Sequence, residues 1–377
     1  MAGYQASNPE TKAESQHLLD SFITQIMENC SGRKAQPSSK ASIFRVPQRL
    51  RQLKESAYTP HIVSIGPYHK YDERLQEMEY HKISYTHNLL SRVRPKPNQP
   101  SDATTIKDIT DKILEKVADA RSCYAADDAR SCYASDNGLD DDVRQKSANH
   151  PQNGDPILGN ILVCLGVRND LLLMENQIPM FVLQILFDFG LVKPYTLYDL
   201  IISFFGNMLN FNLKIRKVVK PETAAHILGL LHDCYLPCDT AALERQNANQ
   251  IIKHTAIDLD RAGVVFKEGK GREQICMNFS TSCGFSFLRG TSPRDTSDDI
   301  PLCGRTSFEI PKLCIYDSTE AFLRNLIAFE QCSPSIPRHI TSYAFLMDTL
   351  INTKEDVEVL EKAGVLDNHL GASEDAT

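Results

Sequence analysis

The chain has 377 residues, of which 42% are hydrophobic and 24% are charged. This composition is typical of a globular protein with a buried core, and it excludes a disordered or fibrous chain. The net charge of −7 at pH 7 lacks the basic excess of a phosphate-binding surface. We therefore expect no nucleic-acid partner.

The cysteines and the chain start indicate a reducing compartment. There are eleven cysteines without regular spacing, and the first residues lack the apolar segment of a secretory signal. An odd number of cysteines in such a chain predicts reduced thiols rather than a disulfide framework. The sequence has no window of about 18 to 20 consecutive apolar residues, the length of a membrane-spanning helix. As written, the sequence predicts a cytoplasmic protein.

The sequence predicts a short N-terminal segment followed by one large domain. Residues 1–40 predict a helix at 17–27 and a polar linker, and the domain extends over 41–371 with a short tail at 372–377. Residues 43–47 (IFRVP) and 61–68 are β-prone runs closed by prolines, which favours edge strands or extended segments. A helix is then predicted to begin near Asp72.

A tandem duplication interrupts the next region. Residues 119–127 (DARSCYAAD) and 128–136 (DARSCYASD) differ at one position. A helix continuing through both copies would rotate everything downstream by half a turn, because nine residues make two and a half turns. We therefore expect one copy to loop out, within a disordered insertion at 125–156. Its charged part, residues 134–156, is a candidate surface for partner specificity.

The second half predicts core helices at 157–189, 197–213 and 226–235. Between residues 263 and 316, β-prone runs alternate with turn-rich segments, which indicates a small antiparallel sheet. Asp317 and Glu320 have the spacing of a capping box for the next helix, and two further helices are predicted from Ile340 and Thr353. The fold class is therefore mainly α with a small antiparallel β-sheet (α+β), in a single large helical domain.

Three stretches place fixed polar residues inside apolar runs, at residues 57–69, 170–183 and 320–332. The second contains Glu175, Asn176 and Gln177 in succession, and each buried polar group costs about 1–3 kcal/mol unless it finds a partner. Together with IFRVP, MEYHK (residues 78–82) and EIPKLCIYDSTE (residues 309–320), this ordered set resembles the plant family called domain of unknown function 247, also known as uncharacterised protein family 0481.

The resemblance implies a fold and a lineage, but no reaction. The residues that match the family motifs are Arg45, Pro47, Tyr58, Pro60, Gly66, Pro67, His69, Glu79, Lys82, Asp170, Glu175, Asn176, Gln177, Pro179, Pro311, Asn325 and Glu330. Members of the family usually continue to a C-terminal transmembrane helix, and some are linked to pollen self-incompatibility in grasses. This sequence ends at Thr377, so the resemblance implies a plasma-membrane or other membrane location if such a helix is missing from it.

Three hypotheses of function follow. The leading one is a non-enzymatic interaction or recognition module with a protein partner. The second is a hydrolase that uses Glu175 and Glu330, or Glu79, as an acid/base pair. The structural alternative is that Glu79 pairs with Lys82 while residues 175–177 satisfy backbone groups. The third is a truncated, non-functional copy. The chain has no nucleophile elbow, P-loop, dinucleotide fingerprint or zincin motif, so no catalytic residue is assigned.

A cluster of metal-ligand residue types lies at His226, His232, Cys234 and Cys238. On a helix, the two histidines are about 240° apart and face different directions, so they cannot share one tetrahedral ion. The structural alternative is a pair of small buried thiols and a surface histidine near the helix end. We predict neither a metal site nor a cofactor.

Overall fold

The computed structural model describes residues 41–92, 102–126, 129, 155, 157, 159–190, 195–206, 224–236, 252–269, 278–281 and 306–370. The predicted helix at 17–27, the tail at 372–377, Cys238 and most of the 125–156 insertion, with the second repeat copy apart from Ala129, lie outside these residues.

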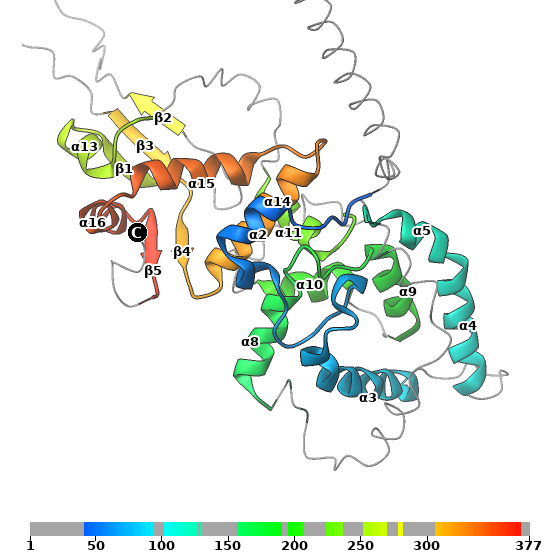
Figure 1. The fold of residues 1–377 in the computed structure, drawn as a ribbon. Coiled ribbons are helices and arrows are strands. Elements are labelled where there is room, and N and C mark those ends of the chain that lie inside the picture. The colour runs from blue at the N-terminus through cyan, green and yellow to red at the C-terminus, as the bar shows by residue number, and fades with distance from the viewer. Residues whose placement is uncertain are drawn as a thin grey trace, which may run out of the picture.

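Helices make up most of the described chain (Figure 1). The α-helices are α2 (Gln48–Leu53), α3 (Gln76–Arg92), α4 (Asp102–Glu115), α5 (Val117–Ser122), α8 (Ile161–Asp170), α9 (Met180–Gly190), α10 (Leu197–Phe205), α11 (Ile227–Tyr235), α13 (Ala256–Arg261), α14 (Thr319–Cys332), α15 (His339–Leu350) and α16 (Lys354–Lys362). Three 3-10 turns, η1 (Glu55–Tyr58), η2 (Pro67–His69) and η3 (Glu73–Leu75), precede α3. The mainly helical fold predicted from the sequence is confirmed.

The strands are β1 (Val265–Glu268), β2 (Asn278–Thr281), β3 (Thr306–Ile310), β4 (Leu313–Ile315) and β5 (Leu366–Asn368). They form a three-stranded sheet of order β1-β3-β2 and a separate β4-β5 pair. Only the β2-β3 pairing has the predicted antiparallel sense, whereas β1-β3 and β4-β5 are parallel. Parallel neighbours require long connections, which a run of β-prone segments does not reveal.

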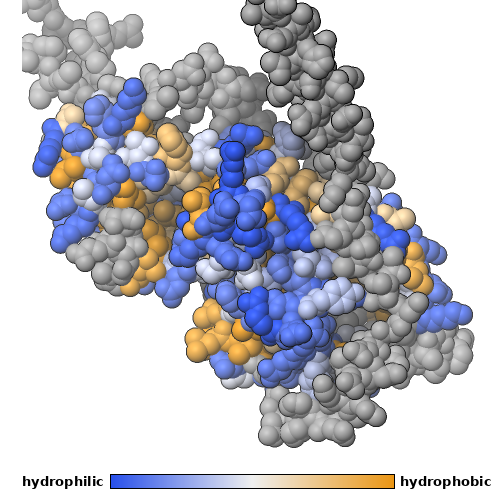
Figure 2. Space-filling view, viewed as in Figure 1, coloured by the Kyte–Doolittle hydropathy of each residue, from blue (hydrophilic) through white to orange (hydrophobic). Residues whose placement is uncertain are grey.

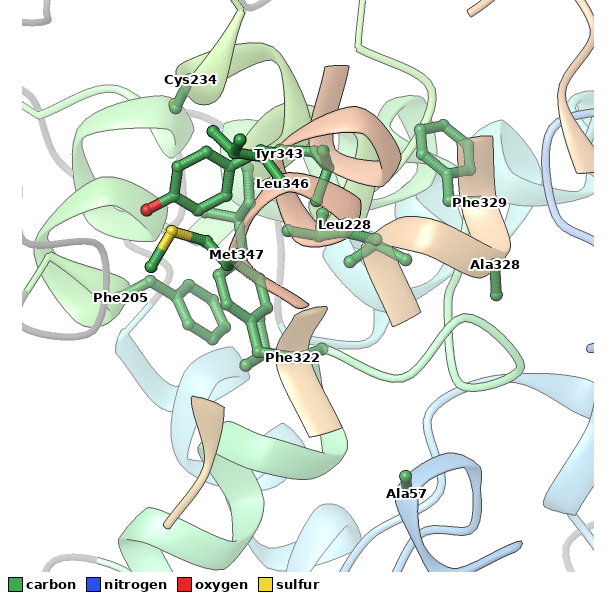
Figure 3. Packing of buried hydrophobic residues seen from close by; sticks show 14 of the residues in the cluster. Ala57, Phe205, Leu228, Cys234, Phe322, Ala328, Phe329, Tyr343, Leu346 and Met347 are labelled. Atoms are coloured by element: carbon green, nitrogen blue, oxygen red, sulfur yellow. The ribbon is translucent and has the colours of Figure 1, made fainter. Parts of the chain in front are cut away.

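One large core joins the helices to the sheets. Helix α11 is buried almost all round, so it lies inside the protein rather than on its surface. Helix α14 packs against both α11 and α15, and its buried residues recur at the three- and four-residue spacing of one helix face. Figure 3 shows the meeting of Phe205, Leu228, Phe322 and Met347, which come from α10, α11, α14 and α15.

The N-terminal part of the domain is extended, as expected, but it forms no regular strand. Ile43 makes an isolated parallel bridge with Tyr124, the tyrosine of the first repeat copy. The Ile43 N–H donates to the Cys123 carbonyl at 2.9 Å, and the Ala125 N–H donates to the Ile43 carbonyl at 3.0 Å. The first copy therefore supplies α5 and the buried Tyr124 to the domain.

The predicted capping box at the start of α14 is not formed. Ser318 is the N-cap residue, and it makes no side-chain cap hydrogen bond. Glu320 instead forms ion pairs with Arg324 at 2.9 Å and with Lys54 at 3.3 Å. The helix therefore begins without the reciprocal bonds that the Asp317 and Glu320 spacing indicated.

Candidate functional site

Asp170 is the last residue of α8, and its buried carboxylate holds a separate segment of the chain. It accepts hydrogen bonds from the backbone N–H groups of His61 at 3.0 Å, Ile62 at 2.6 Å and Val63 at 2.8 Å. Burial raises the pKa of Asp170 above its ordinary value, although these three donors oppose the shift. The Asp170 carboxylate thus accepts the backbone hydrogen bonds of this extended segment, which a neighbouring strand would accept in a sheet.

Asn176 binds the next residues of the segment that Asp170 holds. Its Oδ1 accepts from the N–H groups of Ile65 at 2.7 Å and Gly66 at 3.2 Å, while its Nδ2 donates to the carbonyls of Val63 at 2.8 Å and Asp170 at 2.9 Å. This buried amide therefore uses both of its donors and both of its acceptor positions. No capacity remains for a ligand.

Gln177 ties the loop after α8 to the beginning of α11. Its Nε2 donates to the carbonyls of Leu171 at 2.8 Å and Leu173 at 2.9 Å, and its Oε1 accepts from the Leu228 N–H at 3.0 Å. The Tyr124 hydroxyl donates to the Gln177 carbonyl at 3.0 Å. Gln177 therefore supplies an acceptor to one of the N–H groups that a helix start leaves unpaired.

Residues 64–69 (SIGPYH) lie directly on this loop. A Cβ added at Gly66 would come within 2.8 Å of the Gln177 carbonyl oxygen, so only glycine fits without movement of the backbone. Lys82 on α3 donates to the Ser64 carbonyl at 2.6 Å and forms an ion pair with Glu79. The Glu79–Lys82 pair matches the structural alternative that the sequence offered for this glutamate.

Glu175 is buried and fixes the N-terminal segment. Its Oε1 accepts from the Val46 N–H at 2.7 Å, and its Oε2 lies 2.6 Å from Arg51 Nη2 and 3.5 Å from His69 Nε2. Burial alone would raise the pKa of Glu175, but the bonds with His69 and Arg51 outweigh it and lower the pKa. The ionised carboxylate is thus held by the Val46 N–H and the Arg51 guanidinium.

Asn325 makes the corresponding attachment from α14. Its Oδ1 accepts from the Met174 N–H at 2.9 Å, and its Nδ2 donates to the carbonyls of Ala57 at 2.7 Å and Ala321 at 2.8 Å. This one side chain therefore connects η1, the loop after α8 and its own helix.

Glu330, also on α14, forms a buried pair with His232 on α11, and both side chains are 0% exposed. Its Oε1 lies 3.0 Å from His232 Nε2 and accepts from the Ile340 N–H at 2.8 Å. Its Oε2 accepts from the Thr341 N–H at 2.7 Å and the Thr341 hydroxyl at 2.6 Å. Glu330 thus satisfies two of the N–H groups at the start of α15.

Burial would raise the pKa of Glu330 and lower that of His232. The contact with His232 and the donors from α15 reverse the first shift. The contacts of His232 with Asp233 and Glu330 reverse the second. The pKa of Glu330 is lowered and that of His232 is raised, which favours the ionised pair. The predicted surface histidine is therefore wrong, because α11 is an interior helix in which a polar side chain requires a buried partner.

His226 is the buried N-cap residue of α11. Its Nδ1 accepts from the Gly229 N–H at 3.0 Å, and its Nε2 lies 3.0 Å from the Ser42 carbonyl. This arrangement requires the neutral tautomer that carries its proton on Nε2. Burial lowers the pKa of His226 to about 4. The imidazole therefore serves as a helix cap, with both nitrogens engaged.

The other family-motif residues lie in ring contacts, at turns, at helix starts or in buried positions. The Arg45 guanidinium lies 4.6 Å from the centre of the Tyr68 ring. The remaining ones are Pro47 at the N-cap of α2, the buried Tyr58 and Pro60, Pro67 at the start of η2, and Pro179 and Pro311, whose carbonyls accept hydrogen bonds from Val182 and Tyr343. These positions stabilise turns, helix starts and packing.

We call Asp170, Glu175, Asn176, Gln177, Asn325 and Glu330 the polar anchors. They share one arrangement, in which a buried side chain binds backbone groups of another segment of the fold. The structural alternative proposed for residues 175–177 is confirmed by these bonds. Glu175 and Glu330, the two carboxylates of the hydrolase hypothesis, bind different partners of the fold.

Sequence reasoning missed two features of this network, namely the pairing of His232 with Glu330 and the buried carboxylate of Asp356. The His232–Glu330 pair joins residues 98 positions apart, so no local pattern signals it. Asp356 is also buried, and it accepts from the N–H groups of Ile257 at 2.9 Å and Thr353 at 3.0 Å. The Thr353 and Asp356 spacing is that of a capping box, so this second case was detectable from the sequence.

The fold and its anchors define a mainly helical protein in which polar side chains, rather than long sheets, hold the extended segments. A family profile described as DUF247, plant protein of unknown function, matches residues 43–377. The chain therefore belongs to this family, as the ordered motifs predicted.

Two proteins of Arabidopsis thaliana are similar to the chain. UPF0481 protein At3g47200 is 26% identical over 352 residues, which cover 89% of this chain and 70% of that protein. Putative UPF0481 protein At3g02645 is 25% identical over 419 residues, which cover 89% of this chain and 76% of that protein. No solved structure matches the chain. Within the described residues, none of the helices combines the length and the apolar character needed to cross a membrane.

Proposed function

We propose that this chain is a non-enzymatic interaction module that binds a protein partner. The observation that carries the proposal is that the carboxylates a hydrolase would need are already bound within the fold. Glu175 holds Val46 and Arg51, and Glu330 holds His232 and the start of α15. A general acid or base must reach the substrate with the atom that transfers the proton, whereas these oxygens bind groups of the protein.

The first turn of α8 offers a surface for the partner. Ile161 and Leu162 are 69% and 73% exposed there, and Figure 2 shows an apolar patch over this end of the molecule. Adjacent exposed apolar side chains are typical of protein contact sites. Residues 134–156, to which the sequence analysis assigned partner specificity, precede this turn in the chain. We infer that the first turn of α8 contributes apolar contact area and that the preceding segment selects the partner.

The family suggests a narrower form of this proposal. A partner in pollen self-recognition, presented at a membrane, would agree with the role to which some family members are linked. The proposed contact surface does not depend on this narrower role, because its support is the exposure of Ile161 and Leu162 alone.

The test compares crosslinked complexes of three forms of the full chain, expressed in plant tissue and quantified by mass spectrometry. The double variant Ile161→Asp/Leu162→Asp places two charges on the proposed surface. The matched control Leu53→Asp places a charge on α2, at a side chain that is also 70% exposed. We expect at least one protein to be enriched with the wild type and the control and to fall at least tenfold with the double variant.

Equal recovery with all three forms would contradict the proposed surface. A hydrolase would give a different result, namely turnover of an ester, amide or glycoside library by the wild type that is abolished in both Glu175→Gln and Glu330→Gln. Such turnover, with each variant shown to be folded, would replace the interaction proposal.

A further inference from the structure

A second cluster of chemically active side chains lies on the small β4-β5 sheet, which Figure 1 shows away from α8 and α9. The two strands are parallel, and their register places Cys314 directly opposite Asp367. The His369 N–H donates to the Ile315 carbonyl at 2.9 Å, which continues the pairing beyond β5. Because side chains alternate along a strand, His369 follows Asp367 on the face that Cys314 shares.

The three side chains present their ligand atoms to one another. Cys314 Sγ lies 4.0 Å from Asp367 Oδ2, and His369 Nε2 lies 3.5 Å from Asp367 Oδ1. One ligand atom from each residue can be chosen so that all three lie within 4.8 Å of one another. A thiol, an imidazole and a carboxylate therefore converge on one small volume.

These separations suit a transition-metal ion. Zinc binds thiolate sulfur at about 2.3 Å and imidazole nitrogen or carboxylate oxygen at about 2.0–2.2 Å, so tetrahedral ligand atoms lie roughly 3.3–3.6 Å apart. The three atoms need to approach by at most about 1.5 Å to reach this spacing. A sulfur and nitrogen donor pair selects zinc over magnesium or calcium, which prefer oxygen ligands. We propose that Cys314, Asp367 and His369 form a Zn²⁺ site with three protein ligands.

The surroundings orient the ligands and leave the site accessible. The Tyr316 ring stacks on the His369 ring with 4.4 Å between centroids and 3° between planes, which holds the imidazole beside Asp367. Cys314 is buried, whereas Asp367 and His369 are partly or largely exposed, so an ion can reach the cluster from solvent. Oriented ligands lose little freedom on binding, which favours affinity.

Lys312 opposes metal binding and supplies a sensitive test. Its Nζ lies 2.8 Å from Asp367 Oδ2, on the strand side that also contains Cys314. The ammonium neutralises the carboxylate, and its positive charge repels a cation at the same place. Removal of this charge therefore increases Zn²⁺ affinity, whereas a purely structural Lys312–Asp367 ion pair would give no such gain.

The sequence analysis assigned no metal site, because Cys314 and Asp367 are 53 positions apart and no local spacing joins them. Only the parallel pairing of β4 with β5 brings them together. The bound ion would clamp β5 onto β4 and so stabilise the C-terminal end of the described chain.

The experiment titrates Zn²⁺ into the full reduced chain, stripped of metal with a chelator that is then removed, in competition with a chromophoric chelator. We expect one site whose affinity falls at least tenfold in Cys314→Ser, Asp367→Asn and His369→Gln. The control Cys164→Ser removes a partly exposed cysteine outside the cluster and should leave the affinity unchanged. Lys312→Met should bind Zn²⁺ several-fold more tightly.

Co²⁺ gives a second readout that does not depend on a loss of stability. Bound Co²⁺ should show a thiolate charge-transfer absorption in the wild type and in Cys164→Ser, but not in Cys314→Ser. Far-UV circular dichroism verifies that each variant is folded. The proposal is overturned if Cys314→Ser binds Zn²⁺ as tightly as the wild type, if the Co²⁺ band survives in that variant, or if Lys312→Met gives no increase in affinity.

Discussion

Glu330→Gln is the sharpest test of the polar anchors, because it changes one oxygen of a buried carboxylate into an amide nitrogen. The wild-type oxygens accept from His232, from the Ile340 N–H and from the N–H and hydroxyl of Thr341. A glutamine has one acceptor oxygen and one donor group. In either orientation, its NH2 group faces a backbone N–H of α15.

The cost follows from these contacts. One buried backbone N–H without an acceptor costs about 1–3 kcal/mol, and loss of the ionised pair with His232 adds to this because both side chains are 0% exposed. We expect the free energy of unfolding to fall by about 2–4 kcal/mol, which is a large part of the roughly 5–15 kcal/mol of a typical domain.

The assay is urea unfolding followed by circular dichroism at 222 nm, because the chain contains no tryptophan to report by fluorescence. The matched control is Glu320→Gln on the same helix, where the carboxylate is 51% exposed and pairs with Arg324. Its expected cost is below about 0.5 kcal/mol, since exposed ion pairs contribute little. Equal losses in the two variants would refute the reasoning that backbone attachment by Glu330, rather than charge alone, stabilises the fold.

Three further predictions concern other parts of the network. In the same urea assay, Gly66→Ala should destabilise the protein by about 1–3 kcal/mol, because the new Cβ would lie 2.8 Å from the Gln177 carbonyl oxygen. Gly229→Ala should instead stabilise α11 by up to about 1 kcal/mol, because no atom lies closer than 3.5 Å to the new Cβ. The pKa of His226 is depressed to about 4 in the folded state, so its contribution to stability is present above its ordinary pKa of 6.5 and is lost as the pH falls toward 4. His226→Asn keeps a capping side chain and should remove about 3 kcal/mol of that pH dependence, and an unchanged slope between pH 6.5 and 4 would contradict the assignment. Tyr124→Phe should cost about 1 kcal/mol by removing the hydroxyl bond to the loop after α8. Tyr195→Phe, at a side chain that is 61% exposed, should be neutral, and equal losses in the two variants would contradict the role of the Tyr124 hydroxyl.

Local sequence patterns predicted the helices well. A helix was predicted after Asp317 and Glu320, and the buried face of α14 has the three- and four-residue spacing of a helix face. A helix was also predicted at residues 226–235, but the sequence could not show that α11 is buried almost all round and that His232 is inside. Burial depends on what packs around a helix, which periodicity within one segment does not specify.

The polar anchors were visible in the sequence, but their partners were not. A Glu, an Asn and a Gln in succession within an apolar stretch indicated that residues 175–177 require buried partners. The long-range bonds of these residues join segments 51 to 129 positions apart, as from Gln177 to Leu228 and from Val46 to Glu175. Such distances are set by chain topology, and a single sequence carries no local signal for them.

The sequence by itself determined the family, through its ordered motifs. It also determined the mainly helical class and the positions where polar groups must be satisfied, because periodicity and the cost of an unpaired polar group are local properties. Only the tertiary structure decided which groups satisfy them, the parallel pairing of β4 with β5, and the meeting of Cys314, Asp367 and His369. These features arise when distant segments pack together, so their geometry exists only in the folded chain.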